Sequence, residues 1–199
     1  MHLFVILALA SVATCTALQS TLIRREPKTF QLIRNGKYPE YLKKLKSTQT
    51  AAGAGANVYR ADFEIAQRVA IGTPPQEALA WLCTQASIMW VPHVDCRSQR
   101  CQNRRKFDPN QSSTFTPSDK KWQAIAYGGG SAAGILGSDQ VKMGGTNEAE
   151  MSIPNITFGL ATSLEIEIGE VEADGLLGLA FVPYEGTNSE PFITSAFRQ

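Results

Sequence analysis

Cys83 and His93 have side chains of the types that take part in nucleophilic catalysis. A cysteine thiolate is a strong nucleophile, but it needs a neighbouring base or a helix N-terminus to lower the pKa of the thiol. His93 is the only histidine besides His2. Ten residues of mostly extended chain should carry it well away from Cys83. This spacing disfavours a cysteine peptidase, and most cysteines within an apolar run such as Leu79–Cys83 are buried and inert.

The composition indicates one globular domain accompanied by processed segments. The chain has 199 residues, of which 43% are apolar and 19% are charged, which argues against disorder and against a coiled coil. The net charge of +1 lacks the large positive excess that is typical of nucleic-acid-binding domains. This small value hides an asymmetry, because residues 1–50 carry a net charge of +6 and residues 51–199 carry −5. A basic head therefore precedes an acidic body.

Residues 1–17 resemble a secretory signal peptide. The apolar run Leu3–Ala13 is followed by small residues around Cys15–Ala17, which is typical of a cleavage site. The alternative is a buried N-terminal strand or helix. No apolar run reaches the ~18–20 residues that span a bilayer, so we expect no stable membrane anchor. We predict a chain that enters the secretory pathway and is secreted or lysosomal.

Two other features agree with an oxidising compartment. Cys96 and Cys101 lie five residues apart in a polar loop, which predicts a small disulfide loop. A zinc site is the alternative, although no histidine or second cysteine pair stands at ligand spacing. We predict neither a metal nor another cofactor. Two glycosylation sequons begin at Asn110 and Asn155 in turn-rich contexts.

Residues 18–56 form a basic segment and a linker. Tyr38–Lys46 places apolar side chains at helical spacing, and Thr50–Ala56 consists of small residues that favour a flexible linker. The segment is either a solvated basic helix or a removable pro-segment that covers an acidic face. Opposite charge favours the pro-segment, with cleavage between residues 51 and 56. Acid should loosen it, because carboxylates protonate near pH ~4.

Residues 57–199 have the pattern of an all-β domain. Short apolar runs rich in β-branched and aromatic residues alternate with Gly, Pro and Asn clusters. Apolar residues in Pro191–Phe197 have helix-like spacing instead. The runs predicted to be extended are Arg68–Ile71, Leu79–Val91, Trp122–Tyr127, Ile135–Met143 and Ile153–Phe158.

Seven segments, in order and at family spacing, resemble pepsin-like aspartic peptidases over residues 58–182. They are Ile71–Gln76 (IGTPPQ), Trp90–Pro92 (WVP), Cys96–Cys101, Phe107–Phe115 (FDPNQSSTF), Ile125–Ser131 (IAYGGGS), Phe158–Ala161 (FGLA) and Asp174–Leu179 (DGLLGL). One such match would be weak evidence, whereas seven in register are specific. The resemblance implies the N-terminal lobe of the pepsin-like acid protease fold, a double-psi-type β-barrel, with a partly helical basic pro-segment.

The same resemblance implies that a second lobe is missing. Members of the family hydrolyse peptides with two carboxylates that share one proton, one from an Asp-Thr-Gly loop in each lobe. No second Asp-Thr-Gly or Asp-Ser-Gly motif follows in this sequence. We therefore expect the lobe at residues 57–199 to be truncated, whether by splicing, by truncation or by an incomplete gene model.

Cys83 stands where the family has its first catalytic Asp. The sequence Cys83–Ser87 reads CTQAS where the family reads DTGSS, so Thr84 is kept while Gln85 replaces the loop glycine. A thiol has a reference pKa of ~8.5 against ~3.9 for Asp, so it stays neutral in acid. It also lacks the pair of acceptor oxygens. We predict that this chain does not hydrolyse peptides.

The substrate-facing residues of the family are retained. Tyr127 matches the tyrosine of the flap, a hairpin that covers the substrate, and Trp90 matches the tryptophan that hydrogen-bonds to it. Gly128 and Gly130 would let the hairpin tip bend toward a ligand. The alternative is that both aromatics are ordinary sheet residues. Asp174 matches the family's Asp-Gly and is expected to be structural rather than a substitute catalytic residue.

Three functions remain open. The chain is an aspartic endopeptidase homologue that is inactive as written, or a pseudo-peptidase that binds a peptide or protein without cutting it, or a fragment without independent function. The partners expected are a peptide or protein ligand, the chain's own pro-segment and a second lobe, and we expect no nucleic acid. A lone lobe would also expose its inter-lobe face, which favours aggregation or pairing.

Overall fold

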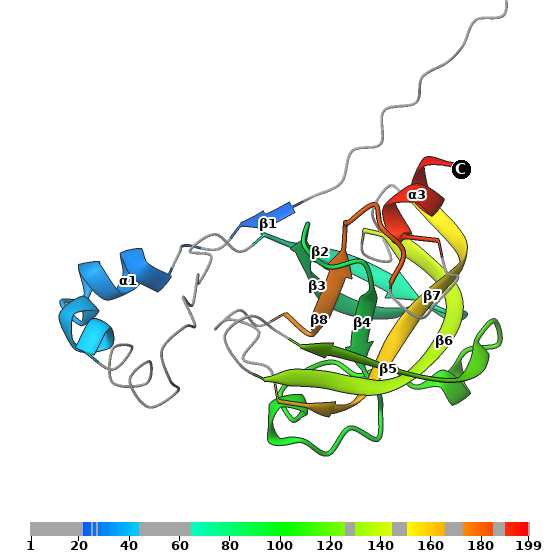
Figure 1. Cartoon of the computed structure of the whole chain (residues 1–199), viewed down its shortest axis with the longest axis horizontal. Helices are drawn as coiled ribbons and strands as arrows, with labels where there is room; N and C mark the ends of the chain where they lie inside the picture. The colour runs from blue at the N-terminus through cyan, green and yellow to red at the C-terminus, as the bar shows by residue number, and fades with distance from the viewer. Residues whose placement is uncertain are drawn as a thin grey trace, which may run out of the picture.

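Figure 1 shows the computed structural model of the chain. The predicted signal peptide at 1–17, the linker at 50–56 and the flap residues Tyr127 and Gly128 lie outside the described residues. The residues described are 22–24, 26, 28–43, 65–125, 130–144, 151–165, 173–184 and 190–198.

The body is one sheet that closes into a barrel. Its eight strands have the order β1-β2-β3-β8-β4-β7-β6-β5, and an additional β2–β6 pairing closes a ring of six strands with β1 and β5 outside it. This confirms the prediction of an all-β, pepsin-like lobe. The strands are β1 (Leu22–Arg24), β2 (Ile65–Ile71), β3 (Gln76–Cys83), β4 (Met89–Pro92), β5 (Thr116–Ile125), β6 (Ser131–Met143), β7 (Met151–Leu164) and β8 (Gly175–Gly178).

The prediction of one continuous extended run over Leu79–Val91 is wrong. The run contains two strands, β3 and β4, joined by residues 84–88, and the two strands are not neighbours. The strand β8, which comes from about ninety residues further along the chain, lies between them, parallel to β3 and antiparallel to β4. The connection 84–88 therefore has to cross the end of β8, and this crossing positions Cys83.

Strand alternation creates two apolar clusters on opposite faces of the sheet. In β4, Met89 and Val91 join the first cluster while Trp90 joins the second. In β8, Leu177 and Leu176 divide in the same way. The period of two residues explains this division, because successive side chains of a strand point to opposite faces. Both faces of the central strands are buried, which accounts for their nearly continuous apolar sequence.

The basic N-terminal segment contributes one strand and two helices. Strand β1 pairs antiparallel with β2 over Ile65–Gln67, next to the part of β2 that β6 pairs with. The helix α1 (Lys28–Arg34) and a second helix over residues 38–43 follow, and Figure 1 shows α1 apart from the strands of the barrel. The predicted helix at Tyr38–Lys46 is confirmed for its described part, whereas α1 and β1 were not predicted.

The remaining regular elements are short. Two 3₁₀ turns, η1 (Gln99–Cys101) and η2 (Pro109–Gln111), lie between β4 and β5. The helix α3 (Phe192–Phe197) confirms the predicted helical spacing and packs on β7 and β8 with Phe192 buried. Within the part of the chain that the structure describes, none of the helices has the length and apolar character needed to cross a membrane.

Candidate active-site loop

Cys83 ends β3 and begins the loop that would carry the catalytic group in a pepsin-like lobe. Its thiol is free and its side chain is partly buried, while Thr84 and Gln85 form an exposed turn. Two backbone hydrogen bonds tie the loop to the end of β8, since Leu179 N donates to Cys83 O at 2.9 Å and Ala180 N donates to Ala86 O at 3.0 Å. The loop is therefore held by backbone hydrogen bonds to the residues that directly follow β8.

Gly178 sits directly beneath this loop, opposite Cys83 in the parallel β3–β8 register. A Cβ atom at Gly178 would lie 2.6 Å from Ala86 O, 2.7 Å from Ile88 O and 2.8 Å from Ile88 N. All three atoms belong to the backbone, so no side-chain movement can make room. The glycine is required because the loop passes directly over the strand.

Replacing Gly178 by alanine should destabilise the protein by about 3 kcal/mol, the upper end of the usual cost of overpacking. The matched control is Gln85→Ala in the same loop, where the side chain is exposed and the change should stay within about 0.5 kcal/mol. Urea unfolding followed by tryptophan fluorescence measures both values. Equal stability of Gly178→Ala and Gln85→Ala would contradict the tight crossing described above.

The surroundings of Cys83 are apolar. Trp81, Cys83 and Ala86 pack against the second cluster, which includes Ile88 and Trp90. Among the described residues, no group of three His, Cys, Asp or Glu side chains is placed to hold a metal ion. Cys83 is therefore a partly buried thiol for which the described part of the chain shows no charged partner.

His93 lies at a different level of the barrel from Cys83. Cys83 pairs with Gly178, and Trp90 pairs with Leu176 on the same strand β8. Since β8 and β4 are antiparallel, His93 lies five residues along β4 from the level of Cys83, which is roughly 16 Å at ~3.3 Å per residue. Its Nδ1 accepts a hydrogen bond of 3.0 Å from Asp95 N. The expected separation of the two side chains is confirmed.

Trp90 is almost fully buried and stacks on Trp122, with ring centroids 6.0 Å apart and an interplanar angle of 29°. Trp122 belongs to β5, the strand that leads into the predicted flap. Gly130, on the other side of the predicted tip, has φ 97°, a left-handed conformation that favours glycine. Trp90 thus contacts the base of the predicted flap, while its contact with Tyr127 stays a prediction.

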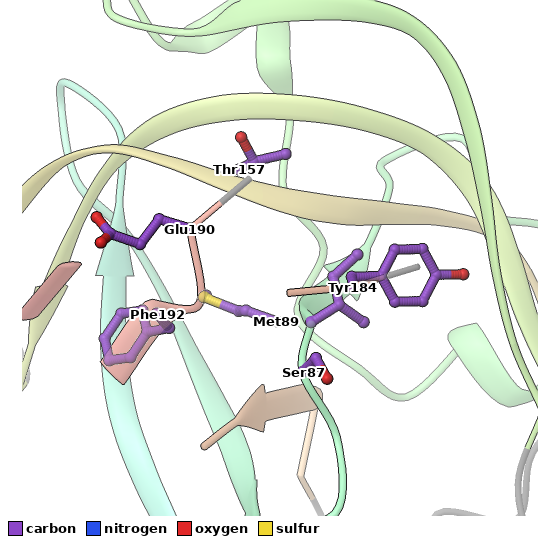
Figure 2. A pocket seen from close by; sticks show the side chains of 7 residues that line it. Ser87, Met89, Thr157, Tyr184, Glu190 and Phe192 are labelled. Carbon is purple, nitrogen blue, oxygen red and sulfur yellow. The ribbon is translucent and has the colours of Figure 1, made fainter. Parts of the chain in front are cut away.

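Tyr184 is a further residue at this site that the sequence analysis did not identify. Its hydroxyl donates to Gln123 O and accepts from Gln123 N, and Tyr184 packs, as Cys83 does, against the second cluster. Figure 2 shows Tyr184, Ser87, Met89 and other side chains around a cavity of about 10 Å³, which is room for about one water. The sequence alone does not indicate a role for Tyr184, because its partner Gln123 lies sixty-one residues earlier in the chain.

Asp174 is a structural carboxylate. Its Oδ2 accepts from Leu79 N and its Oδ1 accepts from Arg105 N, both at 2.7 Å. Its own backbone N donates to Leu79 O, also at 2.7 Å, and its side chain is buried. The carboxylate therefore ties the start of β8 to β3 and to residue 105, which agrees with the structural role expected for Asp174.

The remaining predicted sites are a buried cysteine pair and two exposed asparagines. Cys96 and Cys101 form a disulfide with an S–S distance of 2.01 Å, which confirms the predicted pairing and overturns the zinc alternative. Asn110 and Asn155 are both exposed, and their glycosylation stays a prediction. Asn155 has φ 54°, a conformation that asparagine tolerates better than most residues.

Comparison with known proteins identifies the family. A family model described as "Eukaryotic aspartyl protease" matches residues 64–199. Over 205 residues the chain is 36% identical to "Aspartic protease 6" of Caenorhabditis elegans, covering 100% of this chain and 52% of that protein. It is 32% identical over 212 residues to "Pepsin A" of Sus scrofa, covering 100% and 52%.

Chymosin of Callithrix jacchus is 41% identical over 134 residues, 65% of this chain and 33% of that protein. The chain spans about half the length of the full-coverage relatives. The family model alone covers more than half of the chain, and the observed barrel is the fold expected from the seven motifs. The chain therefore belongs to the eukaryotic aspartyl protease family.

Proposed function

We propose that this chain is a non-catalytic member of its family, an aspartic endopeptidase homologue that does not cut peptide bonds by itself. The observation that carries the proposal is Cys83 at the end of β3, in the loop held over β8. The family's reaction needs one carboxylate to accept a proton from water while a second polarises the scissile carbonyl. A cysteine side chain offers one weak donor and no paired acceptor oxygens.

Neither His93 nor Asp174, the two candidates among the described residues, can replace the missing acid–base group. Removing such a group usually lowers the rate by ~10²–10⁴-fold, and groups that act together lose more. His93 is roughly 16 Å from the level of Cys83 by strand spacing. Asp174 uses both carboxylate oxygens to accept backbone N–H groups. These contacts support inactivity of the chain as written.

The test is an acid-protease assay on the purified 199-residue chain, with a quenched fluorescent peptide at pH 3–5 and with pepstatin as the inhibitor. We expect no pepstatin-sensitive hydrolysis from the wild type. The Cys83→Asp variant should also be inactive, because the sequence contains no second Asp-Thr-Gly or Asp-Ser-Gly loop. Hydrolysis by the wild type that pepstatin abolishes would refute the proposal, and a full-length relative serves as the positive control.

A second candidate function is binding of a peptide or protein without cleavage. The Trp90–Trp122 stack and the Tyr184 contacts with Gln123 both hold β5, the strand that precedes the predicted flap residue Tyr127. A rigid flap base would favour ligand capture. Titration calorimetry with pepstatin and with a peptide library should detect binding that Tyr127→Ala weakens. Absence of binding to the wild type would leave the fragment interpretation.

We also propose that residues 18–56 act as a pro-segment of a secreted or lysosomal protein, after removal of a signal peptide at 1–17. Support comes from β1, which adds to the β2 edge and so links this segment to the barrel. The ion pair of Arg34 with Glu26 at 2.9 Å stays within the segment. N-terminal sequencing of the secreted product before and after acidification tests cleavage near residues 51–56.

A further inference from the structure

Two asparagines that lie 45 residues apart in the sequence begin the two glycosylation sequons, Asn110–Ser112 and Asn155–Thr157. In this motif an asparagine is separated by one residue from a serine or threonine. The sequence contains five other asparagines, and none of them begins such a motif. The structure shows how these two sites are presented and where they lie relative to each other.

Both asparagine side chains are exposed and chemically uncommitted. Asn110 lies in the 3₁₀ turn η2, where its backbone N donates to Asp108 Oδ1 at 3.0 Å. That bond leaves the side-chain amide of Asn110 unused. Within the part of the chain that the structure describes, neither the Asn110 nor the Asn155 side-chain amide takes part in a hydrogen bond. Both Nδ2 atoms are therefore accessible to a reacting group.

Asn155 is exposed because it lies in a β-bulge of β7. Asp139 and Val141 of β6 pair with Ile156 and Ile153, so two residues of β7 face one residue of β6. The φ of Asn155 is 54°, and a bulged residue is left outside the regular ladder of the sheet. The bulge thus presents an exposed amide between the buried side chains of Ile153 and Ile156.

The fold brings the two sequons together at Asp139. The hydroxyl of Ser112, the last residue of the first sequon, donates to Asp139 Oδ2 at 2.7 Å. Asp139 in turn pairs with Ile156, the middle residue of the second sequon. Both sides also contact one turn, since Thr73 N donates to Ser112 Oγ at 3.0 Å and Gln140 Nε2 donates to Thr73 Oγ1. One hydrogen bond and one strand pairing therefore separate the sequons.

The hydroxyls of both sequons are engaged in the folded lobe. Ser112 Oγ is bound to the buried Asp139, and Thr157 Oγ1 lies 3.0 Å from Ser138 Oγ. The motif requires this hydroxyl for modification of the asparagine. Attachment of a glycan should therefore precede folding of β6 and β7.

We propose that Asn110 and Asn155 carry neighbouring N-linked oligosaccharides, which cover the surface around Asp139. This rests on the proposed entry of the chain into the secretory pathway, where a transferase uses an oligosaccharide carried on a lipid pyrophosphate. The asparagine Nδ2 forms a bond to the anomeric carbon of the sugar and loses a proton to a base of the transferase. The bond from that carbon to the pyrophosphate breaks, and the lipid pyrophosphate leaves. A protein partner would then have to contact another surface, because glycans are bulky and hydrated.

The first test is peptide mapping of the whole wild-type chain after expression in cultured eukaryotic cells. Release of the glycans by peptide N-glycosidase in heavy-oxygen water converts each glycosylated asparagine to a labelled aspartate, which mass spectrometry locates. We expect label at Asn110 and Asn155 and none at Asn103, an exposed asparagine outside any sequon. A secreted chain that lacks label at either site overturns this proposal alone. An unlabelled chain retained in the cytosol overturns both this proposal and the proposed localisation.

The second test measures whether the two glycans are neighbours. The folded Asn110→Gln variant should lose its Asn155 glycan to the glycosidase severalfold faster than the wild type, because a bulky neighbour no longer obstructs the enzyme. The matched control is Asn103→Gln, which should release this glycan at the wild-type rate. Circular dichroism verifies that both variants are folded. Equal release rates for Asn110→Gln and the wild type would contradict the adjacency.

Discussion

Replacing Asp174 with alanine should lower the free energy of unfolding by about 3–5 kcal/mol, the cost usually seen when a buried charged partner is removed. The carboxylate accepts the backbone N–H groups of Leu79 and Arg105, and its removal would leave the buried Leu79 N–H without this acceptor. The loss should loosen β3 and β8 together, because Asp174 directly precedes β8 and also pairs through its backbone with Leu79.

Thermal and urea unfolding of three variants give the measurement. Asp174→Asn keeps one carbonyl acceptor, so it should lose less stability than alanine, by about 1–3 kcal/mol. Asp119→Ala removes an exposed carboxylate of β5 and should change stability by at most about 0.5 kcal/mol. The structural role of Asp174 would be wrong if Asp174→Ala were as stable as Asp119→Ala.

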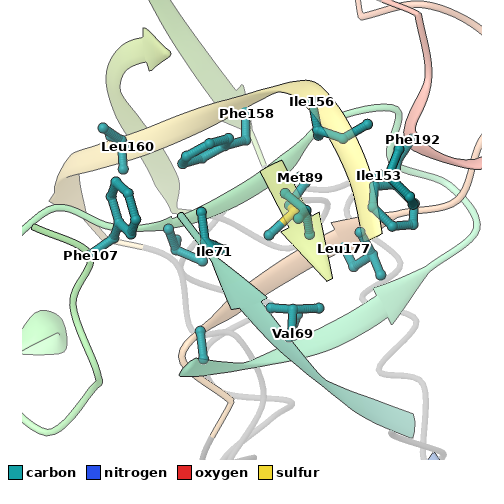
Figure 3. Packing of buried hydrophobic residues seen from close by; sticks show 14 of the residues in the cluster. Val69, Ile71, Met89, Phe107, Ile153, Ile156, Phe158, Leu160, Leu177 and Phe192 are labelled. Carbon is teal, nitrogen blue, oxygen red and sulfur yellow. The ribbon is translucent and has the colours of Figure 1, made fainter. Parts of the chain in front are cut away.

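Phe158→Ala should cost about 3–5 kcal/mol through the cavity left in the first apolar cluster. Phe158 has no exposed surface and lies on β7 at the centre of that cluster. Figure 3 shows it among Phe107, Leu160 and Met89. Its ring centroid lies 5.7 Å from that of Phe107 and 6.4 Å from that of Phe115, with edge-to-face geometry that adds to the loss.

Phe181→Ala is the matched control for this substitution. The Phe181 side chain is 72% exposed, so the same chemical change should alter the urea midpoint very little. Phe158→Leu should recover part of the loss, since it fills more of the cavity than alanine does. A small effect of Phe158→Ala would indicate that the surrounding side chains move in and fill the cavity.

Local patterns in the sequence identified several features that the structure confirms. The alternation of apolar runs with Gly and Pro clusters predicted an all-β body, because strand periodicity and turn chemistry depend on neighbouring residues. The five-residue spacing of Cys96 and Cys101 predicted their disulfide. The order of seven motifs predicted the pepsin-like lobe, whereas the assignment of Cys83 to the position of the catalytic Asp stays a prediction.

Other features depended on contacts between distant parts of the chain. The four residues of β8 are too few and too rich in glycine to predict a strand, and they form one only because β3 and β4 supply partners on both sides. Pairing of β1 with β2 likewise joins residues about forty positions apart. Helix α1 was missed because only seven residues form it and their apolar side chains, such as Phe30 and Ile33, stay exposed.

The amino-acid sequence by itself determined which functional group stands at position 83, since a thiol in place of a carboxylate follows from residue identity alone. Only the tertiary structure decided what surrounds that position: the passage of residues 84–88 over Gly178 of β8 and the Tyr184 contact with Gln123. The physical reason is that residue type sets the functional group and its reference pKa, whereas close approach of backbones depends on long-range strand pairing.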